Sequence, residues 1–391
     1  MENRNWVELP IKDVAVKLTS GGTPSTKKSE YYENGDIPWL NTKEVDYNRI
    51  TSTEKYITEE GLKNSSAKWI EENSVIVAMY GATAAKTAIT KIPLTTNQAC
   101  CNIIVNHEVC DYEFLFYNIS NKYSELENIA VGAAQQNLSV GVIGNFILKF
   151  PPLPEQKAIA SVLSSLDDKI DLLHQQNQTL EALAETLFRQ WFIEDAKEDW
   201  ERKKIGDVLL TVLGGTPSTT KKEFWNGNIP WINSGEVNKF RILEGTKFIT
   251  ELGLKKSNTK LLPIGTTVIA ITGATLGQIS LLEIDTCANQ SVVGIVPNEK
   301  LSKSFVFLWV KNKINEIILN ETGGAQPHIN KNDINETEII IPDSESIDYV
   351  KNNIDPLFDK ISKNCFQIQT LAKLRDTLLP KLMSGEVRVQ L

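Results

Sequence analysis

Hydrophobic residues along the chain follow two kinds of pattern, short β-branched runs and longer stretches with helical spacing. Four apolar runs are typical of buried strands: Val75 to Met79, Ile103 to Val105, Thr267 to Ile271 and Val292 to Val296. The segments Tyr112 to Asn128 and Ser304 to Leu319 carry apolar residues at the period of an amphipathic helix, and shorter amphipathic segments lie at 6–16 and 205–212. Strands and helices alternate within each half, so the pattern predicts an α+β fold with a central sheet in each half.

Two longer stretches, each entered through prolines, have the apolar spacing of a coiled coil. In the first, steps of four and three residues connect Leu163, Leu166, Ile170, Leu173, Asn177, Leu180, Ala184, Leu187 and Trp191. In the second, the same steps connect Ile354, Leu357, Ile361, Asn364, Ile368, Leu371, Arg375, Leu378 and Leu382. A single asparagine interrupts each apolar line, and the spacing predicts two long helices that pair with each other.

The two asparagines predict the direction and register of that pair. In an antiparallel coiled coil, each heptad position a of one helix faces a position d of the other. Asn177 occupies a position a, and Asn364 occupies a position d. Setting them opposite one another pairs both amides, whereas a shift by one heptad buries each amide against an apolar residue at a cost of about 1 to 3 kcal/mol. We expect the matched antiparallel register. The alternatives are that both amides lie at a solvated edge, or that each helix pairs with another protein.

A sequence repeat with a period of about 192 residues shows that the chain contains two copies of one domain. GGTPST at Gly21 to Thr26 returns at Gly214 to Thr219, and NGDIPWL at Asn34 to Leu40 returns as NGNIPWI at Asn226 to Ile232. Combined with the long helices, the repeat predicts four parts: a first domain at 1–152, a central long helix at 153–195, a second domain at 196–342 and a final long helix at 343–391.

Composition places the chain among ordinary globular proteins. Hydrophobic residues make up 41% and charged residues 23% of its 391 residues, and no run of about 18 apolar residues is present to span a membrane. The first residues have no basic start followed by an apolar stretch, so we expect a cytoplasmic protein. The five cysteines form no CxxC pair and no His/Cys cluster with metal spacing, which favours reduced, buried thiols over disulfides or zinc.

The net charge of −8 is unusual for a protein that binds nucleic acid, but it is unevenly distributed. Much of the acidic excess lies in the helical segment 151–199. Elsewhere lysines occur in pairs at Lys27-Lys28, Lys203-Lys204, Lys221-Lys222 and Lys255-Lys256. Two interpretations remain open for these pairs, a surface that faces phosphates or an ordinary solvated face.

The chain contains none of the common catalytic motifs. It has no GxxxxGK[ST] loop, no GxGxxG turn after a strand, no HExxH and no GxSxG elbow. His107, His174 and His328 have no counterparts in the other copy, and Asp343 with Glu345 imitates a nuclease metal site only in part. We expect no catalytic residue and no metal on this chain, with an enzyme of unrecognised chemistry as one alternative.

The repeated motifs, taken as a set, resemble those of the DNA-specificity subunit of type I restriction-modification systems. The resemblance covers nearly the whole chain and rests on the GGTPS turn, the IPW[LI] strand, GAT after an apolar strand, PPLPEQ at Pro151 to Gln156 and LLPKLMSGEVRV at Leu378 to Val389. The second copy departs from it, with Pro342 to Glu345 where the first has PLPEQ. The resemblance implies two target-recognition domains, each reading half of a split DNA sequence, separated by a pseudo-twofold antiparallel coiled coil.

The same resemblance implies partners and cofactors. Two methyltransferase (modification) subunits, which bind S-adenosylmethionine and methylate adenine, are expected to dock on the helices, and ATP-driven restriction subunits to join them. S-adenosylmethionine, ATP and Mg are thus expected on partner subunits and no cofactor on this chain, whose own ligand is double-stranded DNA. The alternative is a structural coiled-coil adaptor that binds proteins rather than DNA, which would lack the steep salt dependence of phosphate-led binding.

The repeat separates residues that maintain the fold from residues that select a sequence, provided that the two copies read different sequences. Shared residues cannot distinguish two half-sites, so they are expected in turns, in the core or at phosphates. Differing polar residues are the candidates for base contacts: Thr42, Lys43, Tyr47, Tyr80, Lys86, Gln136 and Asn137 in the first copy, and Ser234, Asn238, Lys239, Thr272, Gln278 and His328 in the second. Residues beside the glycine-rich turns are the candidates for phosphate contacts: Ser25, Lys27, Lys28, Ser218, Lys221 and Lys222.

The predicted coiled coil also has a length that matters for DNA. A seam of some 28 residues at 1.5 Å per residue is about 42 Å long. One turn of duplex DNA is about 34 Å, so two domains at opposite ends of such a rod would reach sites roughly one turn apart.

Overall fold

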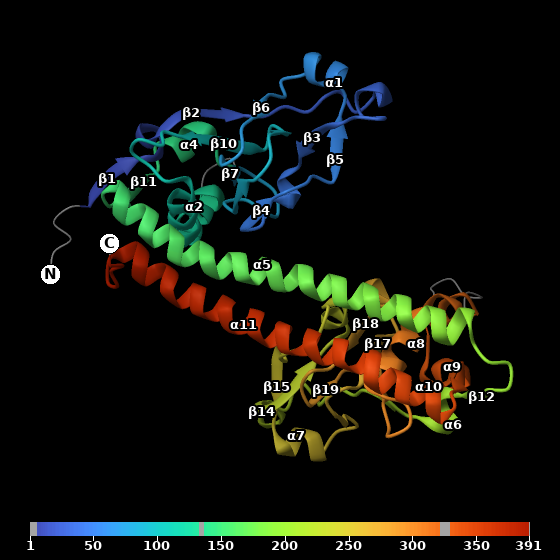
Figure 1. Cartoon of the computed structure of the whole chain (residues 1–391). Helices are drawn as coiled ribbons and strands as arrows, with labels where there is room; N and C mark the ends of the chain where they lie inside the picture. The colour runs from blue at the N-terminus through green and yellow to red at the C-terminus, as the bar shows by residue number, and fades with distance from the viewer. Residues whose placement is uncertain (1–5, 133–136, 321–328, 391) are drawn as a thin grey trace. The chain divides into compact units, whose positions relative to one another are not determined.

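The structure, a computed structural model, describes residues 6–132, 137–320 and 329–390, and the chain divides into two compact units (Figure 1). Unit 1 comprises the residues up to Lys169 together with those from Leu371 onward. Unit 2 comprises Ile170 to Thr370. Each of the two long helices, α5 (Leu153–Arg189) and α11 (Asp355–Ser384), therefore contributes one part to each unit.

Unit 1 contains the first copy of the repeat and has three sheets. The five-stranded sheet has the order β2 (Ala15–Ser20), β10 (Cys100–Val105), β7 (Val75–Ala78), β8 (Thr87–Thr90), β4 (Asn48–Ile50). The four-stranded sheet has the order β5 (Lys55–Ile57), β3 (Ile37–Leu40), β9 (Leu94–Thr96), β6 (Trp69–Ile70). The two-stranded sheet joins β1 (Val7–Pro10) to β11 (Ile147–Phe150). The pairs β3–β9 and β4–β8 are parallel.

The core of unit 1 lies between the five-stranded sheet and its helices. The helices are α1 (Glu59–Lys63), α2 (Tyr112–Asn121), α3 (Tyr123–Gly132), α4 (Val140–Gly144) and the unit 1 parts of α5 and α11, with short 3-10 turns η1 (Ile11–Val14), η2 (Ser29–Tyr31) and η3 (Thr42–Glu44). All residues of β7 are buried, as a strand covered on both faces requires. Phe114 of α2, Leu163 of α5 and Leu382 of α11 meet in one hydrophobic cluster, so both long helices close this core.

Unit 2 repeats this arrangement with the second copy. One four-stranded sheet has the order β13 (Leu210–Leu213), β20 (Val292–Val296), β17 (Thr267–Ala270), β18 (Ile279–Leu281). The other has the order β15 (Lys247–Ile249), β14 (Trp225–Ile232), β19 (Thr286–Ala288), β16 (Leu261–Leu262), in which β14–β19 is parallel. A two-stranded sheet joins β12 (Glu201–Lys204) to β21 (Glu338–Ile341).

Aromatic side chains fill the core of unit 2. Its helices are α6 (Ile205–Val208), α7 (Glu251–Lys255), α8 (Lys303–Asn320), α9 (Lys331–Glu336), α10 (Ser344–Tyr349) and the unit 2 parts of α5 and α11, with 3-10 turns η5 (Lys222–Phe224), η6 (Ser234–Asn238) and η7 (Gly273–Thr275) and π turns η4 (Gln190–Glu194) and η8 (Val350–Ile354). Phe188 and Phe192 of the α5–η4 segment contact Phe305 of α8 edge to face, with ring centroids 5.4 and 5.3 Å apart. Such pairs stabilise a core beyond the area they bury.

Helices α5 and α11 pair antiparallel in both units. In unit 1, Leu163 shares a cluster with Leu382, while Arg375, earlier in α11, lies 2.7 Å from Asp167, later in α5. In unit 2, Asn177 pairs with Asn364, and higher numbers in α5 again accompany lower numbers in α11 within the core. The residues of both predicted seams are buried or half-buried throughout.

The α+β class, the repeated domains and the antiparallel long helices are confirmed. The four apolar runs are the strands β7, β10, β17 and β20. The single central sheet expected in each copy is wrong, because each copy divides its strands between two larger sheets. The single helix expected over Tyr112 to Asn128 is also wrong: Lys122 (φ −101°, ψ 16°) leaves the helical conformation, so α2 and α3 are separate helices.

Candidate nucleic-acid interface

The glycines of the repeated GGTPS turn lie tightly against the end of a strand in both units. In unit 1 the Gly22 amide donates to the Thr96 carbonyl at 2.9 Å, and the Trp39 indole donates to the Gly22 carbonyl at 2.9 Å. A Cβ atom on Gly21 would lie 2.0 Å from the Thr96 carbonyl oxygen, so only glycine fits there.

Unit 2 reproduces these contacts at the equivalent positions. The Gly215 amide donates to the Ala288 carbonyl at 2.8 Å, and the Trp231 indole donates to the Gly215 carbonyl at 3.1 Å. A Cβ atom on Gly214 would lie 2.1 Å from the Asn289 carbonyl oxygen. The two shared glycines of this turn therefore maintain the fold, which is one of the roles expected of residues that both copies share.

A second repeated element, the Asn-Gln dipeptide after β9 or β19, connects this turn to a neighbouring polar segment. In unit 1 the hydroxyl of Thr23 donates to Gln98, and the Asn97 side chain donates to the Asn41 side chain at 2.9 Å. In unit 2 the hydroxyl of Thr216 donates to Gln290 at 2.5 Å. In unit 1 the segments that carry the phosphate candidate Ser25 and the base-reading candidate Thr42 are thus both hydrogen-bonded to this dipeptide.

The phosphate candidates of unit 1, Ser25, Lys27 and Lys28, are all exposed beside the turn. The Lys28 ammonium donates to the Tyr31 hydroxyl at 2.9 Å and lies 3.8 Å from Glu30. The hydrogen bond to Tyr31 raises the pKa of Lys28, so this side chain keeps its positive charge.

The phosphate candidates of unit 2 border an open groove of about 680 Å³. Ser218 and Lys221 line it together with Lys256, Asn258 and Gln290, while Lys222 is exposed nearby on η5. The groove is surrounded by two ammonium groups and by several amide and hydroxyl groups, and it adjoins the backbone amides of a glycine-rich turn. These groups can donate hydrogen bonds to a phosphate.

The base-reading candidates of unit 1 gather on η3, on the residues that follow it, and on the loop after β7. We call residues 42–49 the η3 segment. Thr83 of the β7 loop donates to the Thr42 carbonyl at 2.7 Å, and the Lys86 ammonium lies 2.7 Å from Asp46. Lys86 also lies over the ring of Tyr47, 5.9 Å from its centroid. These contacts bring Thr42, Tyr47 and Lys86 together.

The remaining candidates of unit 1 lie next to this group or outside the described residues. Lys43 is exposed and forms an ion pair with Glu54. Tyr80 is half-buried where β7 ends, and Asn137 is exposed one residue before Leu138, whose amide donates to the Met79 carbonyl at 2.9 Å. Gln136 lies outside the described residues.

Unit 2 presents the same two segments with different side chains. We call residues 234–241 the η6 segment; it carries Ser234, Asn238 and Lys239, with Lys239 3.7 Å from Glu236. Thr272 and Gln278 flank η7, which neighbours η6. The five side chains are exposed or half-buried. His328 lies outside the described residues.

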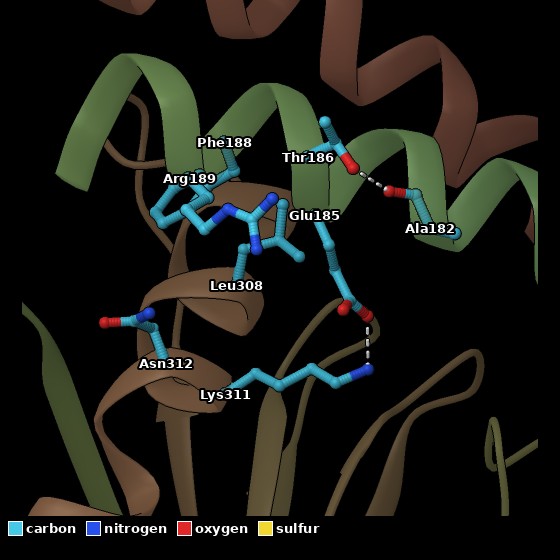
Figure 2. A pocket seen from close by; sticks show the side chains of 8 residues that line it. All are labelled: Ala182, Glu185, Thr186, Phe188, Arg189, Leu308, Lys311 and Asn312. Atoms are coloured by element: carbon cyan, nitrogen blue, oxygen red, sulfur yellow. Dashed lines mark hydrogen bonds and ion pairs between the residues drawn. The ribbon is translucent and has the colours of Figure 1, made fainter. Parts of the chain in front are cut away.

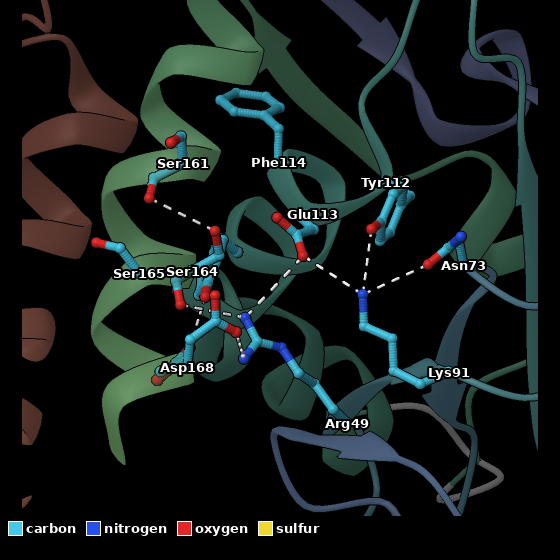
Figure 3. Close-up of polar contacts among 12 residues, drawn as sticks. Arg49, Asn73, Lys91, Tyr112, Glu113, Phe114, Ser161, Ser164, Ser165 and Asp168 are labelled. Carbon is cyan, nitrogen blue, oxygen red and sulfur yellow. Dashed lines mark hydrogen bonds and ion pairs between the residues drawn. The ribbon is translucent and has the colours of Figure 1, made fainter. Parts of the chain in front are cut away.

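Two arginines that the sequence analysis missed, Arg49 and Arg241, end the η3 and η6 segments. They are equivalent in the repeat, since Glu44-Val45 and Arg49-Ile50 return as Glu236-Val237 and Arg241-Ile242. In unit 1 the Arg49 guanidinium lies 2.6 Å from Asp168 of α5, as Figure 3 shows. In unit 2 the Arg241 guanidinium lies 3.6 Å from Glu181 of α5. The repeat itself was the signal that could have found them.

The two seam asparagines are hydrogen-bonded to each other within unit 2. The Asn364 side chain donates to the Asn177 oxygen at 2.8 Å and also to the Gln176 side chain at 2.8 Å, and the Asn177 side chain donates to the Cys365 sulfur at 3.5 Å. Both amides are almost fully buried, with exposed fractions of 2% for Asn177 and 1% for Asn364. A solvated edge therefore does not describe this pair.

The other hollows differ in whether candidate residues line them: Tyr47 lines one of about 300 Å³ in unit 1, and Lys239 lines one of about 380 Å³ in unit 2. A hollow of about 440 Å³ between α5 and α8 is lined by the ion pair of Lys311 with Glu185, by the Arg189 guanidinium, and by Phe188, Leu308 and Asn312 among others (Figure 2). None of the candidate residues lines it. Within residues 6–132, 137–320 and 329–390, no three His, Cys, Asp or Glu side chains gather to hold a metal ion. All five cysteines are buried free thiols.

Two copies of an α+β domain, each packed on its part of two long helices and each presenting the same turn with different polar neighbours, define a duplicated recognition scaffold. The family model of the type I restriction modification DNA specificity domain matches residues 3–182 and 197–369. The chain therefore belongs to the family of type I restriction-modification specificity subunits. No helix in the described part of the chain has the length and hydrophobicity to cross a membrane.

Relatives of known class support this assignment over the full length. The chain is 31% identical over 414 residues to the type I restriction enzyme MjaIX specificity subunit of Methanocaldococcus jannaschii, covering 99% of this chain and 94% of that protein. It is 23% identical to the type I restriction enzyme HindI specificity subunit of Haemophilus influenzae, over 70% of this chain and 77% of that protein. The crystal structure of the S subunit of a type I restriction-modification system from M. genitalium has the same fold, with a TM-score of 0.64 at 17% identity, covering 98% of this chain and 97% of that one.

Proposed function

We propose that this chain selects the DNA sequence on which a type I restriction-modification complex acts, and that each unit reads one half of a bipartite target in double-stranded DNA. The contrast between shared and differing positions carries the proposal. The shared Gly22 and Trp39 are buried, whereas the accessible Tyr47 and Lys86 are replaced by Lys239 and Gln278 in unit 2. One framework with two sets of polar side chains is what reading two different half-sites requires.

Phosphate contacts position each unit on the duplex in this proposal. Lys28 in unit 1 and Lys221 with Lys256 in unit 2 lie beside the glycine-rich turns. Contacts of this kind fix orientation without selecting sequence, and they allow binding by a chain whose net charge is negative.

Catalysis takes place on partner subunits. Two modification subunits bind S-adenosylmethionine and methylate adenine, and restriction subunits use ATP and Mg, so this chain serves as a non-catalytic scaffold in the cytoplasm. Partners are proposed to dock on the long helices, where Leu172 and Leu183 on α5 and Leu374 on α11 are exposed.

The long helices set the gap between the half-sites. Helix α5 is continuous over 37 residues, from Leu153 in unit 1 to Arg189 in unit 2, and α11 is continuous over 30 residues in the opposite sense. At 1.5 Å per residue, removing one heptad shortens a helix by about 10 Å, or about three base pairs of duplex.

Methylation mapping in cells that carry the complete system tests the proposal. Lys86→Gln is expected to change the preferred sequence of one half-site, and Gln278→Lys that of the other. Removing one heptad from each of α5 and α11 is expected to alter the gap and leave both half-sites unchanged. An unchanged gap would contradict the role of the helices.

Two further measurements separate the alternatives. Binding of the assembled complex to duplex DNA should weaken steeply as salt is raised, whereas an adaptor that binds only proteins would show no affinity for duplex. Incubation of the purified chain alone with DNA and S-adenosylmethionine should give no methyl transfer. Methylation without added subunits would contradict the non-catalytic role.

A further inference from the structure

The η3 and η6 segments are held at both ends in the same way. Each begins with a capping box, in which Glu44 accepts from the Asn41 amide at 2.9 Å and Glu236 accepts from the Asn233 amide at 2.9 Å. Each ends two residues beyond a base-reading candidate, at Arg49 or Arg241. Between these two ends residues 46–48 and 238–240 are exposed, whereas Val45 and Val237 are buried.

Arg49 connects the η3 segment to helix α5 by its guanidinium. Its Nη1 lies 2.6 Å from the Asp168 carboxylate, and its Nη2 donates to the Ser164 carbonyl at 3.4 Å (Figure 3). On its other side Nη2 lies 4.0 Å from Glu113 of α2, which also pairs with Lys91 at 3.5 Å. The Arg49 side chain is 12% exposed, whereas that of Asp168 is 71% exposed.

Arg241 makes the equivalent connection in unit 2 in a more buried setting. Its side chain is 1% exposed and its guanidinium lies over the rings of Phe240, Phe307 and Phe358. The Arg241 Nη1 lies 3.6 Å from Glu181 of α5.

A second carboxylate extends the Arg241 connection to the other long helix. Glu283 lies 4.0 Å from Arg241 Nε and accepts a hydrogen bond at 2.6 Å from Ser362 of α11. Arg241 thus faces one carboxylate on α5 and a second one, Glu283, that is hydrogen-bonded to α11.

A buried ion pair is not the simplest way to pack these positions. Well-packed apolar side chains are often as stable or more stable there, because charges lose hydration on burial. The surroundings differ between the units, with a half-exposed network in unit 1 and three aromatic rings in unit 2. What both keep is an arginine at the end of the segment and a carboxylate on α5, so the common feature is a directed contact with that helix.

We propose that Arg49 and Arg241 are positioning residues for DNA recognition, each orienting the base-reading side chains of its segment against helix α5. The inference rests on the proposed function and adds the residues that couple recognition to the helices. Tyr47 and Lys239 lie two residues before the arginines, so a displaced guanidinium shifts the side chains that face the bases.

Substitutions on the helix side test this proposal without changing a residue of the recognition domains, although Glu181 also pairs with Lys311 of α8 at 3.4 Å. Asp168→Asn and Glu181→Gln remove the α5 carboxylates, and Asp168→Glu and Glu181→Asp restore a carboxylate. Glu8→Gln and Glu338→Gln are matched controls, since each removes an exposed carboxylate paired with Lys149 or Arg202 elsewhere in unit 1 or unit 2. The complex with its modification subunits methylates a library in which both half-sites are randomised, and the preference at each position is read by sequencing.

Asp168→Asn is expected to lower discrimination in one half-site about threefold, the size of one partly exposed ion pair, and to leave the other half-site unchanged. Glu181→Gln is expected to lower discrimination about tenfold in the opposite half-site, because its partner is buried. The carboxylate-restoring variants recover discrimination, and the controls retain it. Thermal unfolding of every variant is recorded alongside, since a merely structural contact would change stability and not sequence preference.

The proposal is overturned if Asp168→Asn and Glu181→Gln leave both half-sites as selective as before, or relax both equally. It is also overturned if Asp168→Glu is as relaxed as Asp168→Asn. A wild-type complex that methylates without any bipartite preference would instead overturn the proposed function, and this inference with it.

Discussion

Replacing Asn364 by leucine probes the polar layer of the helix pair in unit 2. The substitution removes the donor that lies 2.8 Å from the Asn177 oxygen, in a layer where both side chains are at most 2% exposed. The Asn177 oxygen then has no donor from α11. Leaving a buried polar group unpaired costs about 1 to 3 kcal/mol.

The double variant Asn177→Leu/Asn364→Leu provides the decisive comparison. Replacing both partners by apolar groups is nearly neutral or stabilising, so the double variant should recover the stability that the single variant loses. For a unit of this size each kcal/mol corresponds to about 2 to 4 °C in unfolding midpoint, so the single variant should unfold about 2 to 12 °C below the wild type. Scanning calorimetry measures these midpoints and separates the transitions of the two units.

Two results would refute this reasoning. If the Asn364→Leu variant unfolds at the same temperature as the wild type, the amide pair contributes nothing to register or stability. A double variant that is less stable than the Asn364→Leu variant would show that each asparagine acts alone.

Three further predictions concern other parts of the molecule. Gly214→Ala should destabilise unit 2 by about 1 to 3 kcal/mol or more in urea unfolding, because its Cβ would lie 2.1 Å from the Asn289 oxygen. Burial raises the pKa of Cys101 to about 12 and that of Cys365 to about 11. Unfolded thiols ionise near pH 8.5, so stability should fall as the pH rises above about 8.5, and a thiol reagent at pH 8 should label the cysteines only after unfolding. Asp343→Ala should lower the free energy of unfolding by about 1 kcal/mol at pH 7, because the Asp343 carboxylate caps α10. The Lys197 ammonium lowers the pKa of Asp343 below its unfolded value near 3.9, so the difference from wild type should shrink as the pH falls below about 4.

The elements that bury apolar surface could be predicted from the sequence because burial imposes a period. Strand β20 has the bounds expected from its apolar run, and the seams of α5 and α11 follow the predicted steps. The break at Lys122 could not be predicted in this way, since apolar residues continue through it at helical spacing while the backbone leaves the helix. Short strands such as β6, with two residues, are defined by their pairing with β9 and carry too little pattern of their own.

The sequence predicts which segments carry the candidate residues, but it does not predict the contacts between their side chains. Comparison of the two copies identified Tyr47 and Lys86, but their approach depends on a turn in which Tyr47 has a φ of 53°, which its residue type does not suggest. The pairing of Lys43 with Glu54 depends in the same way on loop conformation. The role of Arg49 depends on its contact with Asp168, which lies 119 residues away along the chain.

The division of the chain into units has a consequence for its synthesis on the ribosome. Residues 371–390 supply Leu382 and Met383 to the core of unit 1, although about 200 residues of unit 2 are translated between Lys169 and Leu371. At about 5 to 20 residues per second, the nascent first domain waits roughly 10 to 40 s with an apolar surface uncovered. Unit 2 has its whole contiguous chain available earlier, so we expect the second domain to mature first and the first domain to be the one that depends on chaperones.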